Sequence, residues 1–346
     1  DPSKSMLADI ERFHRRIGGR KVYVIGEFGF VPLGEVRKIL DAVIGKGISG
    51  AMTWSLRFHN RDGGFYWHSE PLGGGLYKAY HYPGFASGAA YEEAALLGLM
   101  REKAFEIRGL AAPPVEAPAP PFMLPTKSVA EISWRGSAGA AGYDIERATK
   151  RGGPWTVVGR DVDDTRVQYR PLFSDDTASE GTSYYYRARA KNAAGASAPS
   201  NVVGPLRAEG RTIIDELGDF SRTFARGGLV QLETANARPY KEDTHRLRGG
   251  AGGWVTYRTA GPLRSAAVLV FTEGAGDDFE LYLSRDGASF EKAEPKVSRF
   301  PTAVNPDGYK LPVRYELAAP APGTRFLKIV FRAEAQLSRV ELRHGK

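Results

Sequence analysis

The stretch Lys21-Val-Tyr-Val-Ile-Gly-Glu-Phe-Gly-Phe30 decides how the chain is interpreted. Its run of apolar and aromatic residues predicts a strand over 21–28 that is buried on both faces, as in parallel sheets. Gly26 and Gly29 mark the end of this strand, where the backbone can approach other groups closely. Glu27 is therefore expected at the carboxyl end of a parallel strand, where α/β folds hold their chemistry. The alternative is that Glu27 pairs with an arginine in the core.

The segments around this strand alternate between helix and strand. Apolar residues at helical spacing predict helices over 6–17, 32–44 and 91–107. A second buried strand is expected over 48–56. This (β/α) alternation is typical of a parallel barrel.

Two motifs in this region resemble glycoside hydrolases of the family five type. The motifs are Ile25-Gly-Glu-Phe-Gly29 and, one helix later, Gly50-Ala-Met-Thr-Trp-Ser55. These cellulase- and β-mannanase-like enzymes are retaining hydrolases on a TIM barrel. The resemblance covers residues 1–110 and implies that Glu27 is the nucleophile at the end of the seventh strand. It also implies that Trp54, at the end of the eighth strand, is the sugar platform at the cleavage subsite.

The second carboxylate of such an enzyme is missing from the sequence. Retaining hydrolysis uses two carboxyl groups about 5–5.5 Å apart, a nucleophile and an acid/base. In the family, the acid/base glutamate follows an asparagine at the end of the fourth strand, and no Asn-Glu pair occurs in this chain. Glu35, Asp62 and Glu70 lie near the motifs in sequence, but nothing marks any of them as a replacement. We therefore expect the C-terminal part of a longer enzyme, inactive alone, whose partner is the missing N-terminal part of the barrel.

A long loop is expected after the second motif, over 57–89, and long loops at the carboxyl face of a barrel carry function. It holds three of the six histidines and many aromatic residues. Aromatic rings stack on the C–H faces of sugars, while imidazole and amide groups bond to sugar hydroxyls. The histidines could instead bind a metal, but their spacing is irregular and the chain has no cysteine, so no metal is expected. The alternative is that the aromatics form the core of the loop. The candidates for lining a glycan cleft are Trp54, His59, Asn60, Trp67 and His68.

Two β-rich domains are expected after residues 1–110. Residues 111–121 are rich in alanine and proline and predict a semi-rigid linker. Over 122–207 short strands, among them 129–134, predict an immunoglobulin-like sandwich. The Trp134 strand and the run Tyr184-Tyr-Tyr-Arg-Ala-Arg-Ala-Lys-Asn-Ala-Ala-Gly195 resemble a fibronectin type III module. Trp134 and Tyr186 are expected in its core, and the module is expected to act as a spacer.

The last domain, residues 208–346, is predicted to be a jelly-roll β-sandwich. The turn Leu281-Tyr-Leu-Ser-Arg-Asp-Gly287 and the strand Phe326-Leu-Lys-Ile-Val-Phe331 resemble galactose-binding-like modules. Many such modules bind glycans, although the fold has other uses. The loops 238–245 and 304–309 are equally plausible as ligand loops and as solvated loops.

Composition limits the possible functions. The 346 residues predict two or three domains, and the 42% hydrophobic and 25% charged fractions are typical of globular proteins. The net charge of +8 could suggest nucleic acid, but basic and acidic residues alternate and no binding motif occurs, so none is expected. No apolar run is long enough for a membrane span, and no cofactor is expected. The resemblance implies a secreted, periplasmic or cell-surface bacterial protein.

Two functions remain after these exclusions. The first is part of a retaining β-glycoside hydrolase that degrades a β-linked polysaccharide of the β-mannan or β-glucan type. The alternative is a non-catalytic glycan-binding or adhesion protein with a barrel remnant. Because two βα segments cannot close a barrel, residues 1–110 alone should expose an apolar patch and a bare sheet edge.

Overall fold

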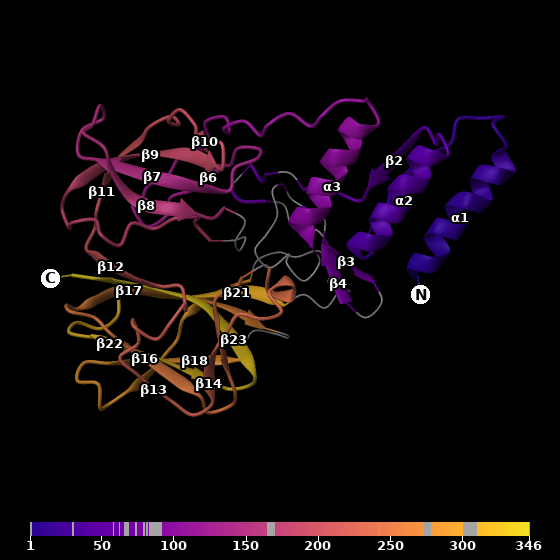
Figure 1. Ribbon diagram of the computed structural model, residues 1–346. Helices are drawn as coiled ribbons and strands as arrows, with labels where there is room; N and C mark the ends of the chain where they lie inside the picture. Colours follow the sequence, from indigo (N-terminus) through magenta and orange to yellow (C-terminus); the bar gives the residue numbers. More distant parts are fainter. Residues whose placement is uncertain are drawn as a thin grey trace.

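The computed structural model describes residues 2–29, 31–57, 59–61, 63–65, 69–72, 75–78, 80, 82, 92–164, 170–241, 243–272, 278–299 and 310–345. Its elements form three units that follow one another along the chain (Figure 1). Three separate clusters of buried side chains are their cores. The clusters run from Ile10 to Leu99, from Met123 to Ala208 and from Leu217 to Leu342.

The first unit has three helices beside a small parallel sheet. Strands β1 and β2 are parallel, and their register pairs Val24 with Gly50 and Phe28 with Thr53. The helices pack on one face of this pair, where Ile25 and Phe28 meet buried residues such as Val36 of α2. The elements are α1 (Pro2–Ile17), β1 (Val24–Phe28), α2 (Leu33–Gly45), β2 (Gly50–Thr53), β3 (Ser69–Leu72), β4 (Gly75–Lys78) and α3 (Glu93–Glu106).

The prediction that both strands are buried on both faces is wrong. Val24 on β1 and Met52 on β2 are 46% and 57% exposed. Next to them, Val22 and Leu56 are 79% and 58% exposed. We call this side of the β1–β2 pair the open face. Among the described residues β1 pairs only with β2, so the structure shows a two-stranded sheet without a closed barrel.

The second unit is an antiparallel β structure. A five-stranded sheet in the order β10-β9-β7-β8, with β11 beside β9, accompanies the short pair β5–β6. Trp134 and Tyr186 are fully buried in the core between them, as predicted. The strand expected over 129–134 is shorter, since only Trp134–Arg135 forms β6 and Ile132 makes an isolated bridge to Phe173. The strands are β5 (Phe122–Met123), β6 (Trp134–Arg135), β7 (Gly142–Ala148), β8 (Thr156–Val162), β9 (Ser183–Asn192), β10 (Gly195–Ala196) and β11 (Val203–Arg207).

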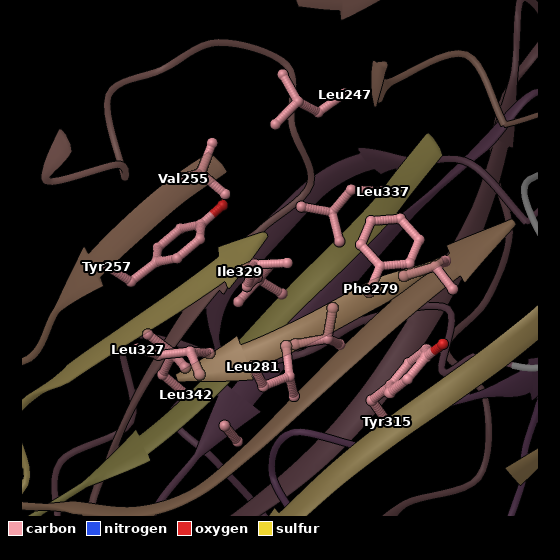
Figure 2. Packing of buried hydrophobic residues seen from close by; sticks show 14 of the residues in the cluster. Leu247, Val255, Tyr257, Phe279, Leu281, Tyr315, Leu327, Ile329, Leu337 and Leu342 are labelled. Carbon is pink, nitrogen blue, oxygen red and sulfur yellow. The ribbon is translucent and has the colours of Figure 1, made fainter. Parts of the chain in front are cut away.

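The third unit is a sandwich of two antiparallel sheets. One sheet has the order β14-β15-β23-β17-β21-β20 with β12 beside β23, and the other has the order β13-β16-β22-β18-β19. Side chains such as Tyr257, Phe279 and Ile329 fill the space between the sheets (Figure 2). The strands are β12 (Arg211–Asp215), β13 (Ala225–Gly227), β14 (Val230–Glu233), β15 (Arg246–Gly249), β16 (Trp254–Arg258), β17 (Leu263–Thr272), β18 (Phe279–Ser284), β19 (Glu291–Ala293), β20 (Lys296–Arg299), β21 (Leu311–Ala318), β22 (Phe326–Phe331) and β23 (Ala335–His344), with a 3-10 helix η2 (Arg238–Tyr240) between β14 and β15.

Candidate functional site

Glu27 and Trp54 lie at the carboxyl ends of the two parallel strands. Phe28 pairs with Thr53, and the backbone N–H of Trp54 donates a hydrogen bond to the carbonyl of Phe28 at 2.8 Å. A Cβ added at Gly29 would lie 3.0 Å from the carbonyl oxygen of Trp54, which is tighter than nine in ten real Cβ contacts. Trp54 is therefore in direct contact with the two residues that follow Glu27.

A β-bulge turns Glu27 away from the helices. Between the pairs Ile25–Ala51 and Phe28–Thr53, β1 advances three residues while β2 advances two. Because of this extra residue, Ile25 and Phe28 both reach the core, and Glu27 is exposed on the open face. Gly26, inside an otherwise apolar strand, was the sequence signal for such an irregularity.

The open face combines a carboxylate, an indole and apolar side chains. Met52 and Trp54 alternate with the inward-directed Ala51 and Thr53, and Trp54 is 37% exposed. Among the described residues, no arginine or lysine forms an ion pair with Glu27. The alternative interpretation, in which Glu27 pairs with an arginine in the core, therefore has no support in the described part of the chain.

The segment after Trp54 is held by a buried tyrosine. The carbonyl of Ser55 accepts a hydrogen bond from the Tyr80 N–H at 2.7 Å, and the Arg57 N–H donates to the Tyr80 carbonyl. Tyr80 is only 4% exposed. These contacts order the segment that carries Trp54, although it lies outside regular secondary structure.

His59 and Asn60 lie where the first unit meets the second. The His59 imidazole stacks on Phe65 with ring centroids 4.1 Å apart, and its Nε2 is 3.5 Å from Oδ2 of Asp164. Burial raises the pKa of Asp164, and the nearby imidazole partly offsets this shift. The N–H of Asn60 donates to the Gly64 carbonyl at 2.7 Å in a tight turn. His59 therefore supports the contact between the units, and Asn60 shapes the turn next to it.

Two further candidates, Trp67 and His68, lie outside the described residues, as does Asp62. Glu35, considered as a second carboxylate, pairs with Lys38 at 2.6 Å on the surface of α2. The side chain of Glu70 on β3 is not among those described. The second carboxylate of a retaining site is thus not identified by the structure.

The loop 238–245 of the third unit is neither open nor solvated. Arg238, Lys241 and Asp243 are each at most 5% exposed, and η2 adjoins β4 of the first unit. Burial lowers the pKa of Lys241 to about 8, and the nearby charge of Arg57 contributes. The expectation of a ligand loop or solvated loop is corrected to a buried contact between the first and third units. The other expected loop, 304–309, lies outside the described residues.

The described part of the chain shows neither a cluster of metal-binding side chains nor a helix suited to cross a membrane. No three His, Asp or Glu side chains there are placed to hold a metal ion together. None of the helices described is both long and apolar enough to cross a membrane.

No model of a known protein family matches the sequence. Part of the chain is similar to a family 6 carbohydrate-binding module from Clostridium stercorarium, solved with cellobiose, at 11% identity and a TM-score of 0.26 over 38% of this chain and 94% of that one. A β-1,3-glucan-binding family 6 module from Bacillus halodurans gives 13% identity and a TM-score of 0.24 over 38% and 95% of the two chains. A family GH115 4-O-methyl-α-glucuronidase gives 13% identity and a TM-score of 0.26 over 42% of this chain and 19% of its own. TM-scores of this size do not assign the chain to any of these families.

Proposed function

We propose that the chain is part of a retaining β-glycoside hydrolase that acts on a β-linked polysaccharide of the β-mannan or β-glucan type. Glu27 is the nucleophile and Trp54 the platform under the sugar at the cleavage point. The observation that carries this proposal is the bulge that brings an exposed carboxylate beside an exposed tryptophan at the ends of two adjacent parallel strands. The resemblance of both motifs to family five enzymes supports the same roles.

The reaction proceeds in two displacements. A carboxylate oxygen of Glu27 bonds to the anomeric carbon while the glycosidic C–O bond breaks, and the leaving oxygen takes a proton from the acid/base carboxyl group. A water molecule, deprotonated by the same group, then attacks the anomeric carbon and releases Glu27. Trp54 holds the apolar face of the sugar during both steps.

In this proposal, the acid/base carboxyl group belongs to a part of the enzyme that is not in this sequence. No Asn-Glu pair occurs in the chain. The open face exposes apolar side chains that a further part of the same enzyme would cover, since exposed apolar patches mark interaction sites. The resemblance also supports a location outside the cytoplasm, as a secreted, periplasmic or cell-surface enzyme of polysaccharide degradation.

Covalent trapping tests the nucleophile. A full-length protein that contains these residues is incubated with 2-deoxy-2-fluoro-β-glucosides and mannosides bearing a fast leaving group, and the peptides are weighed by mass spectrometry. The expected result is a glycosyl mass on the peptide that contains Glu27. Glu27→Gln should take no label, while Glu35→Gln should be labelled normally because Glu35 pairs with Lys38 on α2.

Two outcomes oppose the proposal in different ways. A label on another carboxylate would replace Glu27 as the nucleophile. No label from either reagent in a folded protein that still binds polysaccharide would favour the non-catalytic glycan-binding function. Turnover of a β-mannan or β-glucan oligomer by the 346 residues alone would contradict the external acid/base group.

A further inference from the structure

The outer face of the five-stranded sheet in the third unit carries aromatic and charged side chains. In β16, Val255 and Tyr257 point into the core, so Trp254 and Thr256 point outward (Figure 2). Cross-strand pairing places Lys328 of β22 opposite Thr256, and Tyr282 of β18 opposite Lys328. Trp254, Lys328 and Tyr282 are all partly exposed. We call these three residues the outer-face cluster.

Gly227 makes room for the indole ring of this cluster. Gly227 of β13 is paired directly with Trp254. A Cβ added at Gly227 would lie 2.8 Å from both Cε2 and Cζ2 of the indole and 2.9 Å from Nε1. Real Cβ atoms are essentially never this close to other heavy atoms, so the indole lies across the strand only because residue 227 is glycine. A tryptophan spread over an outer sheet face offers an aromatic surface to a ligand.

The charge of Lys328 is not matched by a carboxylate in the described part of the chain. Its Nζ lies 4.5 Å from the ring centroid of Trp254 and 5.5 Å from that of Phe290. Glu280, on the neighbouring strand β18, already accepts a hydrogen bond from the Tyr282 hydroxyl at 2.7 Å and pairs with Lys292 at 3.0 Å. The ammonium group of Lys328 is therefore available to an anion.

A second tryptophan in the protein shows the contrasting arrangement. The guanidinium of Arg187 lies 4.3 Å from the ring centroid of Trp155 in the second unit. There, however, Glu146 forms an ion pair with Arg187, so the cation next to the ring is already neutralised. Trp155 and Trp254 are thus matched in their aromatic–cation contact and differ in whether the cation has an acidic partner.

We propose that the outer-face cluster binds an acidic polysaccharide. The C–H face of a sugar ring stacks on Trp254, and the carboxylate of a uronic acid pairs with Lys328. The positive net charge of +8 favours approach of such a polymer. The inference adds a binding site to the proposed hydrolase but does not depend on Glu27, because binding is measured without turnover.

A matched pair of polymers tests this site by isothermal titration calorimetry at low salt. Polymannuronate and β-1,4-mannan share a backbone and differ in whether carbon 6 is a carboxylate. The unmodified chain is expected to bind polymannuronate at least about tenfold more tightly than the mannan, since a charge-assisted contact is added. Lys328→Gln should remove that preference and leave the affinity for the neutral polymer unchanged.

Two variants test whether the Trp254 ring itself is needed for binding. Gly227→Ala keeps every polar group but displaces the indole, so it should weaken the binding of polymannuronate by about tenfold. Trp155→Ala is the control and should bind like the unmodified chain. Thermal unfolding shows whether each variant is folded. Lys328→Gln, at a partly exposed position, tests the site even if Gly227→Ala does not fold.

Three results would overturn the proposal. One is equal affinity for the two polymers, and another is unchanged polymannuronate binding in Lys328→Gln. The third is equally tight binding of single-stranded DNA of similar length, which would show attraction to any polyanion. Because covalent labelling of Glu27 does not use the outer face, failure here leaves the proposed hydrolase untouched.

Discussion

The first and third units use strand faces in opposite ways. In the third unit, two antiparallel sheets close on each other, and residues such as Ile329, Phe331 and Leu337 have no exposed surface at all. In the first unit, helices cover one face of β1 and β2, and the open face leaves Val24 and Met52 about half exposed. The third unit therefore buries its apolar surface between its own two sheets, whereas the first unit leaves apolar surface exposed on its open face.

The largest effect on stability should come from the sandwich core. Phe331→Ala removes a ring with no exposed surface that packs 4.8 Å, between ring centroids, from Phe279. We expect a loss of about 3–5 kcal/mol in the unfolding free energy of the third unit, measured by denaturant titration. Val297→Ala, on the half-exposed strand β20, is the control and should cost less than about 0.5 kcal/mol. A similar loss in both variants would mean that burial of Phe331 does not contribute more to the stability of the third unit than a half-exposed residue does.

A charged contact joins the second unit to the third and should rank next. Glu216 pairs with Arg170 and with Arg339, whose side chains are 5% and 2% exposed. Glu216→Gln removes the carboxylate that pairs with Arg170 and leaves Arg339 with Glu341 as its acidic partner, so we expect a loss of about 2 kcal/mol by differential scanning calorimetry. Glu334→Gln, which breaks the exposed pair with Arg248, should cost less than about 0.5 kcal/mol. Equal melting of the two variants would show that this contact does not stabilise the protein.

The buried lysine between the first and third units predicts a pH dependence. Burial lowers the pKa of Lys241 from 10.5 to about 8, so the folded state binds fewer protons than the unfolded state between these values. Stability from this group therefore rises as the pH increases from about 8 to 10.5. Lys241→Met should raise the unfolding free energy by about 2 kcal/mol at pH 7, and the gain should shrink over that pH range.

Thermal melts at graded pH measure this difference, with Lys38→Met as the control. Lys38 has a side chain that is 63% exposed, so its replacement should shift the melting temperature little and equally at every pH. A gain in Lys241→Met that is constant from pH 7 to pH 10 would show that removal of a protonation cost is not its cause.

The smallest effect should come from the open face. Met52→Ser changes a side chain that is 57% exposed, so the unfolding free energy should change by less than about 0.5 kcal/mol. Self-association, followed by analytical ultracentrifugation at increasing concentration, should decrease because the apolar patch is reduced. Ile39→Ser, on the fully buried side of α2, should instead unfold the first unit. Strong destabilisation by Met52→Ser would show that the open face is covered in solution.

Local patterns in the sequence predicted much of the fold. The period of apolar residues predicted helices that match α1, α2 and α3 within a few residues, and the strand expected over 326–331 matches β22. The strand expected over 129–134 failed because Ile132 and Trp134 are buried in a mostly irregular segment. Apolar residues can be buried without the backbone joining a sheet, so an alternating apolar pattern alone does not establish a strand.

The geometry of the candidate site was harder to predict from the sequence than the fold, because it depends on pairing between residues that are distant in the chain. Glu27 and Trp54 were found from their motifs, but the bulge that exposes Glu27 is a property of the register between β1 and β2. The Trp254 surface depends in the same way on its pairing with Gly227. His59 was interpreted as a sugar ligand from its residue type, while its contact with Asp164 joins positions more than a hundred residues apart.

The bulge in β1 has a consequence for variants that differ in length. Because β1 holds one residue more than β2 needs, a deletion of Gly26 would restore regular alternation, with Ile25 and Phe28 still facing the helices and Glu27 still facing outward. Ile25 would still pair with Ala51 and Phe28 with Thr53, so the deletion would leave Glu27 alone opposite Met52. The shortened strand would keep its pairing and lose the extra twist that a bulge adds next to Glu27, so this variant separates the effect of strand length from the effect of residue type.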